Sequence, residues 1–176
     1  MDSARRRLVL VRHAKSAWPD VPDRDRPLAK RGIRQAPLAG AWLRSAGCRP
    51  DLVLCSPARR TRGTWELMAG ELGTAGTVSY EERVYGASAA GLLELVREVP
   101  PSVMTVLVVG HSPGLEDLAA ELADRGPAAG NDALERLRVK FPTAAVAVLA
   151  IPGEWRDLAP GGAWLTDFAV PRDLER

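Results

Sequence analysis

Leu8-Val9-Leu10-Val11-Arg12-His13 is a run of four apolar residues that ends at an arginine and a histidine, and Val106-Leu107-Val108-Val109-Gly110-His111 repeats the arrangement in the second half of the chain. Each run has the length and composition of a buried β-strand. The sequence has two histidines, and each follows the carboxyl end of such a strand. In open α/β sheets, ligands bind in the crevice outside these strand ends. If the two strands are neighbours, both imidazoles face one crevice, and we expect a functional site there.

Amphipathic stretches separate the apolar runs along the chain. Strands are predicted at residues 8–11, 52–55, 78–80, 104–109 and 144–151, and helices at 30–46, 58–72, 88–99 and 113–124. Pro37 should kink the first helix or mark its true first turn, and Ser112 should cap the last one. Residues 126–130 are expected to form a loop, and residues 155–168 a final hairpin. Strands separated by helices predict an α/β fold with a mainly parallel sheet covered on both faces and an antiparallel edge.

Composition places the chain among globular proteins. Its 176 residues are 46% hydrophobic and 26% charged, which suits one domain over residues 1–176. The apolar run after the basic residues 1–7 is too short for a signal peptide, and none approaches the length of a membrane helix. With no secretory signal, Cys48 and Cys55 are expected to be reduced thiols. We therefore expect a cytoplasmic protein that does not bind a membrane.

The charge is unevenly distributed. Residues 1–62 hold 15 of the 24 basic residues but 5 of the 22 acidic ones. This asymmetry indicates an anionic ligand near the basic part. The sequence shows no helix-turn-helix signal and no aromatic-rich strand platform, so nucleic acid is not the expected partner. We expect a small anion, or an anionic group carried on a partner.

A third strand end adds positive charge to the same edge of the predicted sheet. Leu52-Val53-Leu54-Cys55 runs directly into Ser56-Pro57-Ala58-Arg59-Arg60-Thr61, where Pro57 favours the start of a helix. Arg59 or Arg60 would then emerge in the first turn of that helix, on the side of Arg12. Guanidinium groups match phosphate oxygens in pairs and stay charged at any working pH. The glycines of Gly110-His111-Ser112-Pro113-Gly114 add a strand-to-helix turn that favours an anion.

These segments resemble the histidine phosphatase superfamily, which includes phosphoglycerate mutases and acid phosphatases. The resemblance rests on three blocks in order: Leu10-Val11-Arg12-His13-Ala14, residues 56–64 with an arginine four positions after the serine, and residues 109–116 around His111. Residues 12–16, 26–32 and 140–145 further resemble the SixA-like phosphohistidine phosphatases. Together the matches span nearly the whole chain.

The resemblance implies a three-layer α/β/α fold and assigns roles to particular residues. His13 would be the nucleophile, and Arg12, Arg60 and His111 would bind the phosphate. Ser16, Ser112 and Glu82 are expected to contact the substrate. In the mutases and acid phosphatases a carboxylate protonates the leaving oxygen, and here Glu81 and Glu82 are the two candidates. The family implies no metal and no organic cofactor.

The expected reaction is hydrolysis of a phosphohistidine on a protein, through a covalent phosphohistidine on His13. A protonated imidazole leaves easily, whereas an alcohol needs an acid to protonate it. Because a protonated His13 cannot attack, activity should fall below about pH 6–7. The alternatives are a phosphatase of small phosphate esters, a phosphoglycerate mutase-like enzyme, and a non-catalytic phosphate-binding module. A dinucleotide site is disfavoured because no glycine follows the first strand in residues 12–17. The sequence leaves the oligomeric state open.

Overall fold

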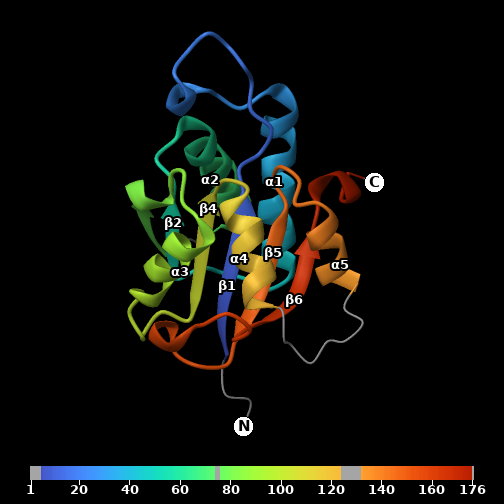
Figure 1. The fold of residues 1–176 in the computed structure, drawn as a ribbon. Coiled ribbons are helices and arrows are strands. Elements are labelled where there is room, and N and C mark those ends of the chain that lie inside the picture. Colours follow the sequence, from blue (N-terminus) through green and yellow to red (C-terminus); the bar gives the residue numbers. More distant parts are fainter. Residues whose placement is uncertain (1–4, 74–75, 124–131, 176) are drawn as a thin grey trace.

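The computed structural model describes residues 5–73, 76–123 and 132–175, and its centre is a six-stranded sheet in the order β3-β2-β4-β1-β5-β6 (Figure 1). The strands are β1 (Arg6–Arg12), β2 (Leu52–Cys55), β3 (Thr77–Tyr80), β4 (Thr105–Gly110), β5 (Val146–Ile151) and β6 (Trp164–Ala169). Strands β1 to β4 pair in parallel, whereas β5 is antiparallel to both β1 and β6. The predicted mainly parallel sheet with antiparallel pairing at one edge is therefore confirmed.

Helices cover both faces of the sheet (Figure 1). They are α1 (Lys30–Ser45), α2 (Arg59–Leu72), α3 (Ala89–Arg97), α4 (Gly114–Leu122) and α5 (Asp132–Val139). Side chains of β1 alternate between the two resulting cores, as the pleat requires. Leu8 and Leu10 pack in the core that contains α3 and α4, and Val9 and Val11 pack in the core that contains α1 and α2. All four side chains are at most 1% exposed, which explains why the strand reads as a continuous apolar run.

The register of the sheet brings the two histidine-bearing strand ends together. Strand β1 lies directly beside β4, with Arg12 opposite Gly110. The His13 amide donates to the carbonyl of Gly110 at 3.0 Å, so the first residue beyond β1 is fixed against the end of β4. The condition on which the predicted crevice depends is therefore met.

A long loop, residues 16–28, rises above this end of the sheet (Figure 1). Its base is closed by an isolated antiparallel bridge between Ser16 and Leu28. The close approach of α1 to this base requires a glycine, because a Cβ on Gly32 would lie 2.2 Å from the carbonyl oxygen of Lys15. The loop is thus held over the strand ends by backbone contacts.

Several local predictions were wrong. Of the two alternatives for Pro37, the helix start is wrong, since α1 begins at Lys30 and continues through Pro37, whereas a kink there stays a prediction. Helix α4 begins at Gly114, so Ser112 lies one residue too early and Pro113 occupies the cap position without a side-chain cap. Residues 155–168 contain a short 3₁₀ turn and the single strand β6, whose partner is β5, instead of a hairpin of their own. Helix α5 was not predicted.

Two remaining expectations concern the loop at 126–130 and the membrane. Residues 126–130 lie outside the described residues. Within the part of the chain that the structure describes, no helix has the length and apolar character needed to cross a membrane.

Candidate active site

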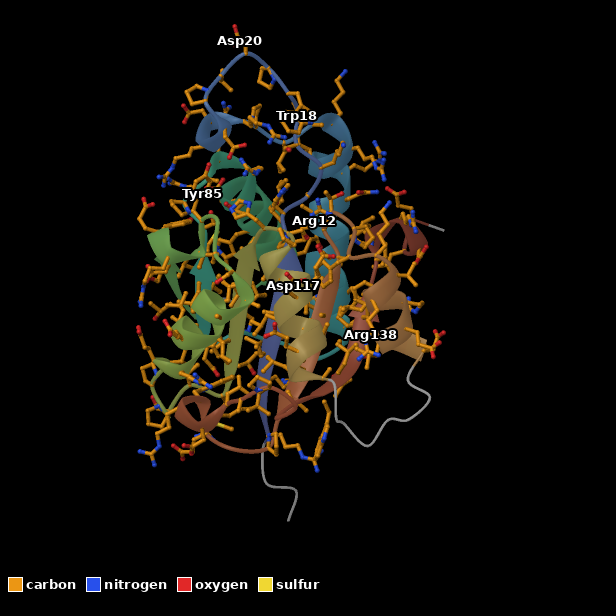
Figure 2. The ribbon with its side chains drawn as sticks, viewed as in Figure 1. Arg12, Trp18, Asp20, Tyr85, Asp117 and Arg138 are labelled. Atoms are coloured by element: carbon orange, nitrogen blue, oxygen red, sulfur yellow. The ribbon has the colours of Figure 1, made fainter. Side chains whose placement is uncertain are left out.

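A cavity of about 400 Å³ lies at the carboxyl ends of β1 and β4, beneath the loop of residues 16–28. Its lining contains six of the residues singled out from the sequence, together with residues of the loop and of the segment after β3. The lining residues are Arg12, His13, Lys15, Ser16, Trp18, Asp23, Arg26, Arg60, Tyr85, Gly86, His111, Ser112 and Thr143. Figure 2 shows Arg12, Trp18 and Tyr85 at this end of the molecule, with Asp20 at the outer tip of the loop.

His13 lies deep in this cavity and is 9% exposed. Its Nδ1 is 2.8 Å from the carbonyl oxygen of Ala14, and because a carbonyl can only accept, Nδ1 carries the proton. The lone pair of the neutral ring is therefore on Nε2. Burial, assisted by the nearby positive charges of Arg60 and Arg12, lowers the pKa of His13 to about 3. The ring therefore stays neutral well below the pH 6–7 limit predicted from an ordinary histidine.

His111 faces His13, with 5.4 Å between the ring centroids. Its Nε2 is 2.7 Å from Oγ of Ser56, and its Nδ1 is 3.4 Å from Nη2 of Arg60. A guanidinium only donates, so Nδ1 accepts and Nε2 donates to the serine. Burial, followed by the charge of Arg60, lowers the pKa of His111 to about 4. Ser56 is fully buried and was not predicted as a site residue, although it begins the second sequence block.

The structure separates the two candidate arginines of α2. Arg60 is 6% exposed and lines the cavity, whereas Arg59 is exposed and lines a different cavity. From the other side, Arg12 donates through Nη1 to the carbonyl of Phe141 at 2.8 Å. Burial lowers the pKa of Arg12. The cavity wall thus carries two guanidinium groups in fixed positions.

Three buried polar atoms of the lining residues have no protein hydrogen-bond partner: Nε of Arg12, Nε of Arg60 and Oγ of Ser112. These atoms are shielded from the cavity, so the ligand is indicated by the cationic side chains that line it, Arg12, Lys15, Arg26 and Arg60. A tetrahedral anion offers several acceptor oxygens, and arginines and hydroxyls are its usual protein ligands. The geometry and charge of the cavity therefore fit a phosphate group.

Asp23 is a cavity residue that sequence reasoning missed. Its Oδ2 accepts from Nη2 of Arg60 at 3.0 Å and from the Tyr85 hydroxyl at 2.5 Å, and its Oδ1 accepts from Nη1 of Arg26 at 3.1 Å. These bonds, first that of Tyr85, hold the pKa of the Asp23 carboxyl well below its usual range. Arg26 belongs to a segment that the SixA resemblance covers. No sequence signal pointed to Asp23, because it lies in the polar loop between the two matched segments at 12–16 and 26–32 and belongs to neither.

Ser16, Ser112 and Glu82 were expected to contact the substrate, and the structure places them differently. Ser16 and Ser112 line the cavity, and Ser16 Oγ accepts from Nη2 of Arg26 at 2.6 Å. Glu82 does not line the cavity: its side chain is 70% exposed and both carboxylate oxygens accept from Arg24. Glu81, the other candidate acid, is paired with Arg83 and is also absent from the lining. Glu81 is held by Arg83 of the same turn and Glu82 by Arg24 of the loop at 16–28, so neither is available to the cavity.

Cys48 and Cys55 are both free and buried. Burial raises the pKa of Cys55 to about 12, so this thiol stays protonated. Among the described residues, no group of three or more His, Cys, Asp or Glu side chains could hold a metal ion. The absence of a metal or cofactor requirement stays a prediction.

Comparisons with known proteins agree with this geometry. The family model of the histidine phosphatase superfamily, branch 1, matches residues 8–87. An uncharacterised protein of Mycobacterium tuberculosis strain H37Rv is 47% identical over 165 residues, which cover 92% of this chain and 100% of that protein.

Two solved structures of proteins proposed to be phosphohistidine phosphatases SixA are also similar. The one from Nakamurella multipartitia has a TM-score of 0.84 and 39% identity, covering 96% of this chain and 98% of that one. The one from Agrobacterium tumefaciens has a TM-score of 0.76 and 31% identity, covering 94% and 98%. The chain therefore belongs to the histidine phosphatase superfamily, and it is a SixA-like phosphatase.

Proposed function

We propose that this phosphatase hydrolyses phosphohistidine on a protein, and that the phosphoryl group passes through a covalent intermediate on His13. One observation carries the proposal. The Nδ1–H of His13 is bound to the carbonyl of Ala14, so the nucleophilic lone pair is on Nε2, in a cavity that Arg12, Arg60 and His111 also line. A nitrogen held neutral in this way attacks phosphorus without first losing a proton.

Arg12, Arg60 and His111 are the proposed ligands of the phosphoryl oxygens. Phosphoryl transfer needs charge stabilisation on these oxygens more than it needs covalent assistance. Arg12 and Arg60 both line the cavity, beside the ring of His13. For Nδ1 of His111 to donate to a phosphoryl oxygen its tautomer must change: the Ser56 hydroxyl then donates to Nε2, and the contact of Nδ1 with Nη2 of Arg60 is given up. Ser56 is therefore proposed as the residue that positions His111 in either tautomer.

The preference for phosphohistidine follows from the acids that the cavity lacks. Glu81 and Glu82 are outside the lining, and Asp23, the one carboxyl that lines the cavity among residues 5–73, 76–123 and 132–175, is held ionised by its hydrogen bonds. An ionised carboxylate has no proton to give to a leaving alkoxide. An imidazole that leaves in its protonated ring form needs no such proton, which supports a phosphoramidate substrate over an alcohol ester. The solved structures assigned to SixA support the same choice.

The test compares three substrates: a histidine-phosphorylated protein, p-nitrophenyl phosphate and a sugar phosphate. Wild-type protein should hydrolyse the phosphohistidine with the highest kcat/KM. His13→Asn, which cannot ionise and is close to histidine in size, should abolish turnover of all three. A rapid acid-free quench should trap phosphate on the wild type and not on this variant, and thermal unfolding of both should establish that the variant is folded.

Each alternative gives a different result. A small-ester phosphatase would hydrolyse the sugar phosphate faster than the phosphohistidine, and a mutase would move the phosphoryl group to a second position of the sugar. A phosphate-binding module would bind inorganic phosphate without trapping any phosphoenzyme. Any of these outcomes would replace the proposed function.

A further inference from the structure

The floor and the mouth of the cavity differ in burial. His13 lies at the floor and is 9% exposed, whereas Trp18 is 78% exposed and the Asp23 side chain is 50% exposed. In an in-line displacement the leaving group departs on the side opposite the nucleophile. A phosphoryl group attacked from the floor by Nε2 of His13 therefore sends its leaving group toward the mouth.

Asp23 is the one carboxylate among the residues that line this cavity within the described part of the chain. Arg60, Tyr85 and Arg26 fix its position through three hydrogen bonds. A carboxylate has about four acceptor positions, so these bonds leave one free, on Oδ1. An anionic acceptor with spare capacity thus lies at the mouth of a cavity that is otherwise cationic.

We propose that Asp23 selects the substrate by its leaving group, accepting a hydrogen bond from the N–H of the phosphohistidine ring nitrogen that does not carry the phosphoryl group. The proposal rests on the proposed function and adds a residue that determines specificity. It explains why a site built for a dianionic phosphate keeps a carboxylate beside its own phosphate-binding arginine. A neutral alcohol or an anionic sugar phosphate has no cation to offer to this position.

The contact keeps a proton where the reaction needs it. In the attack, the lone pair of His13 Nε2 forms the new bond to phosphorus, and the electron pair of the breaking P–N bond returns to the departing ring nitrogen. The proton on the other ring nitrogen stays there throughout. The ring therefore leaves as neutral imidazole, a far better leaving group than the imidazolate that an unprotonated ring would give. Once the ring is neutral its attraction to Asp23 weakens, which favours release.

Asp23 also orients Arg60, and this second role predicts a different outcome. A residue that only positions a phosphate-binding arginine affects every phosphorylated substrate alike. A residue that contacts the cationic leaving group affects phosphohistidine more than p-nitrophenyl phosphate, whose p-nitrophenolate leaves as an anion without a proton. The ratio of kcat/KM for these two substrates separates the roles, and it does not depend on the fraction of a variant that is folded.

The experiment measures this ratio for wild type, Asp23→Asn and the control Asp25→Asn. Asp25 belongs to the same 3₁₀ turn, Asp23–Asp25, but lines a separate cavity of about 830 Å³ and not the active site. In Asp23→Asn the ratio should fall about 10- to 100-fold, the loss expected when one hydrogen bond to a charged group is removed. The fall should grow above neutral pH, where free phosphohistidine is largely unprotonated. Asp25→Asn should keep the wild-type ratio.

An unchanged ratio in Asp23→Asn overturns the inference, whether both activities stay high or fall together. An equal fall of the ratio in Asp25→Asn also overturns it, because the effect would then reflect the charge of the loop in general. In both cases wild-type phosphohistidine hydrolysis stands. If wild type itself does not hydrolyse phosphohistidine, the proposed function fails first, and the inference fails with it.

Discussion

Acidification should destabilise this protein through its two buried histidines. An unfolded histidine has a pKa near 6.5, whereas the pKa of His13 is about 3 and that of His111 about 4 in the folded chain. Between these values the unfolded state binds protons that the folded state does not. The free energy of unfolding therefore falls as the pH falls below about 6.5, and it is restored as the pH rises.

The size of the effect follows from the two shifts. Each pH unit below 6.5 costs about 1.4 kcal/mol for each histidine that stays neutral in the fold. At pH 4.5 both His13 and His111 are still largely neutral when folded, so the two together cost about 5 kcal/mol relative to pH 7. This is comparable with the whole stability of a typical domain, about 5–15 kcal/mol.

Urea unfolding at pH 7 and pH 4.5 measures this loss, and a double variant isolates it. Carboxylates also contribute to acid unfolding, but they are the same in wild type and in His13→Asn/His111→Asn. The double variant should lose about 5 kcal/mol less than wild type between the two pH values, because asparagine does not titrate. An equal loss in both proteins would refute the argument that the histidines are held neutral by burial.

Three further predictions concern single residues. Arg60→Ala should lower kcat/KM for p-nitrophenyl phosphate about 100- to 1,000-fold, as loss of a charge-stabilising donor does, and Arg59→Ala should have a small effect; equal losses would contradict the assignment of Arg60. Gly32→Ala should lower Tm in thermal unfolding, since its Cβ would lie 2.2 Å from a backbone carbonyl oxygen, whereas Gly70→Ala, with open space around it, should not. In a pH–rate profile of wild type, protonation of His13 should not lower kcat/KM above about pH 4. Any loss of kcat/KM near pH 6 should instead follow the pKa of the substrate's phosphate and change with the substrate. A loss near pH 6.5 that is the same for every substrate would contradict the lowered pKa of His13.

The histidines at the floor of the site could be predicted from the sequence, because one rule relates ligand sites to the ends of parallel strands. A buried parallel strand ends at the edge where ligands bind, and His13 and His111 each follow such a strand. Arg60 follows β2, which pairs with β4 on the opposite side from β1. Three strand ends that are adjacent in the sheet thus bring together residues far apart in the chain.

The mouth of the site could not be predicted in the same way. Asp23 lies in a loop whose position depends on a bridge between Ser16 and Leu28 and on the close approach of Gly32 to the loop base, and neither has a local pattern. Glu82 seemed a candidate acid because it follows a strand, but its orientation is decided by pairing with Arg24 of that same loop. A polar residue in a loop takes its direction from tertiary contacts, which strand and helix periodicity do not report.

Burial of His13 has two consequences that cannot be separated. The low-polarity surroundings and nearby guanidinium groups that destabilise an imidazolium keep the Nε2 lone pair available for attack at neutral and moderately acidic pH. The same surroundings make the imidazolium less stable in the folded chain than in the unfolded chain. This difference is the origin of the expected acid sensitivity. A phosphate dianion in the cavity offsets the positive charges of Arg12 and Arg60 around His13. The site is therefore electrostatically incomplete without its substrate, and what it loses in stability at low pH is linked directly to what it gains in reactivity.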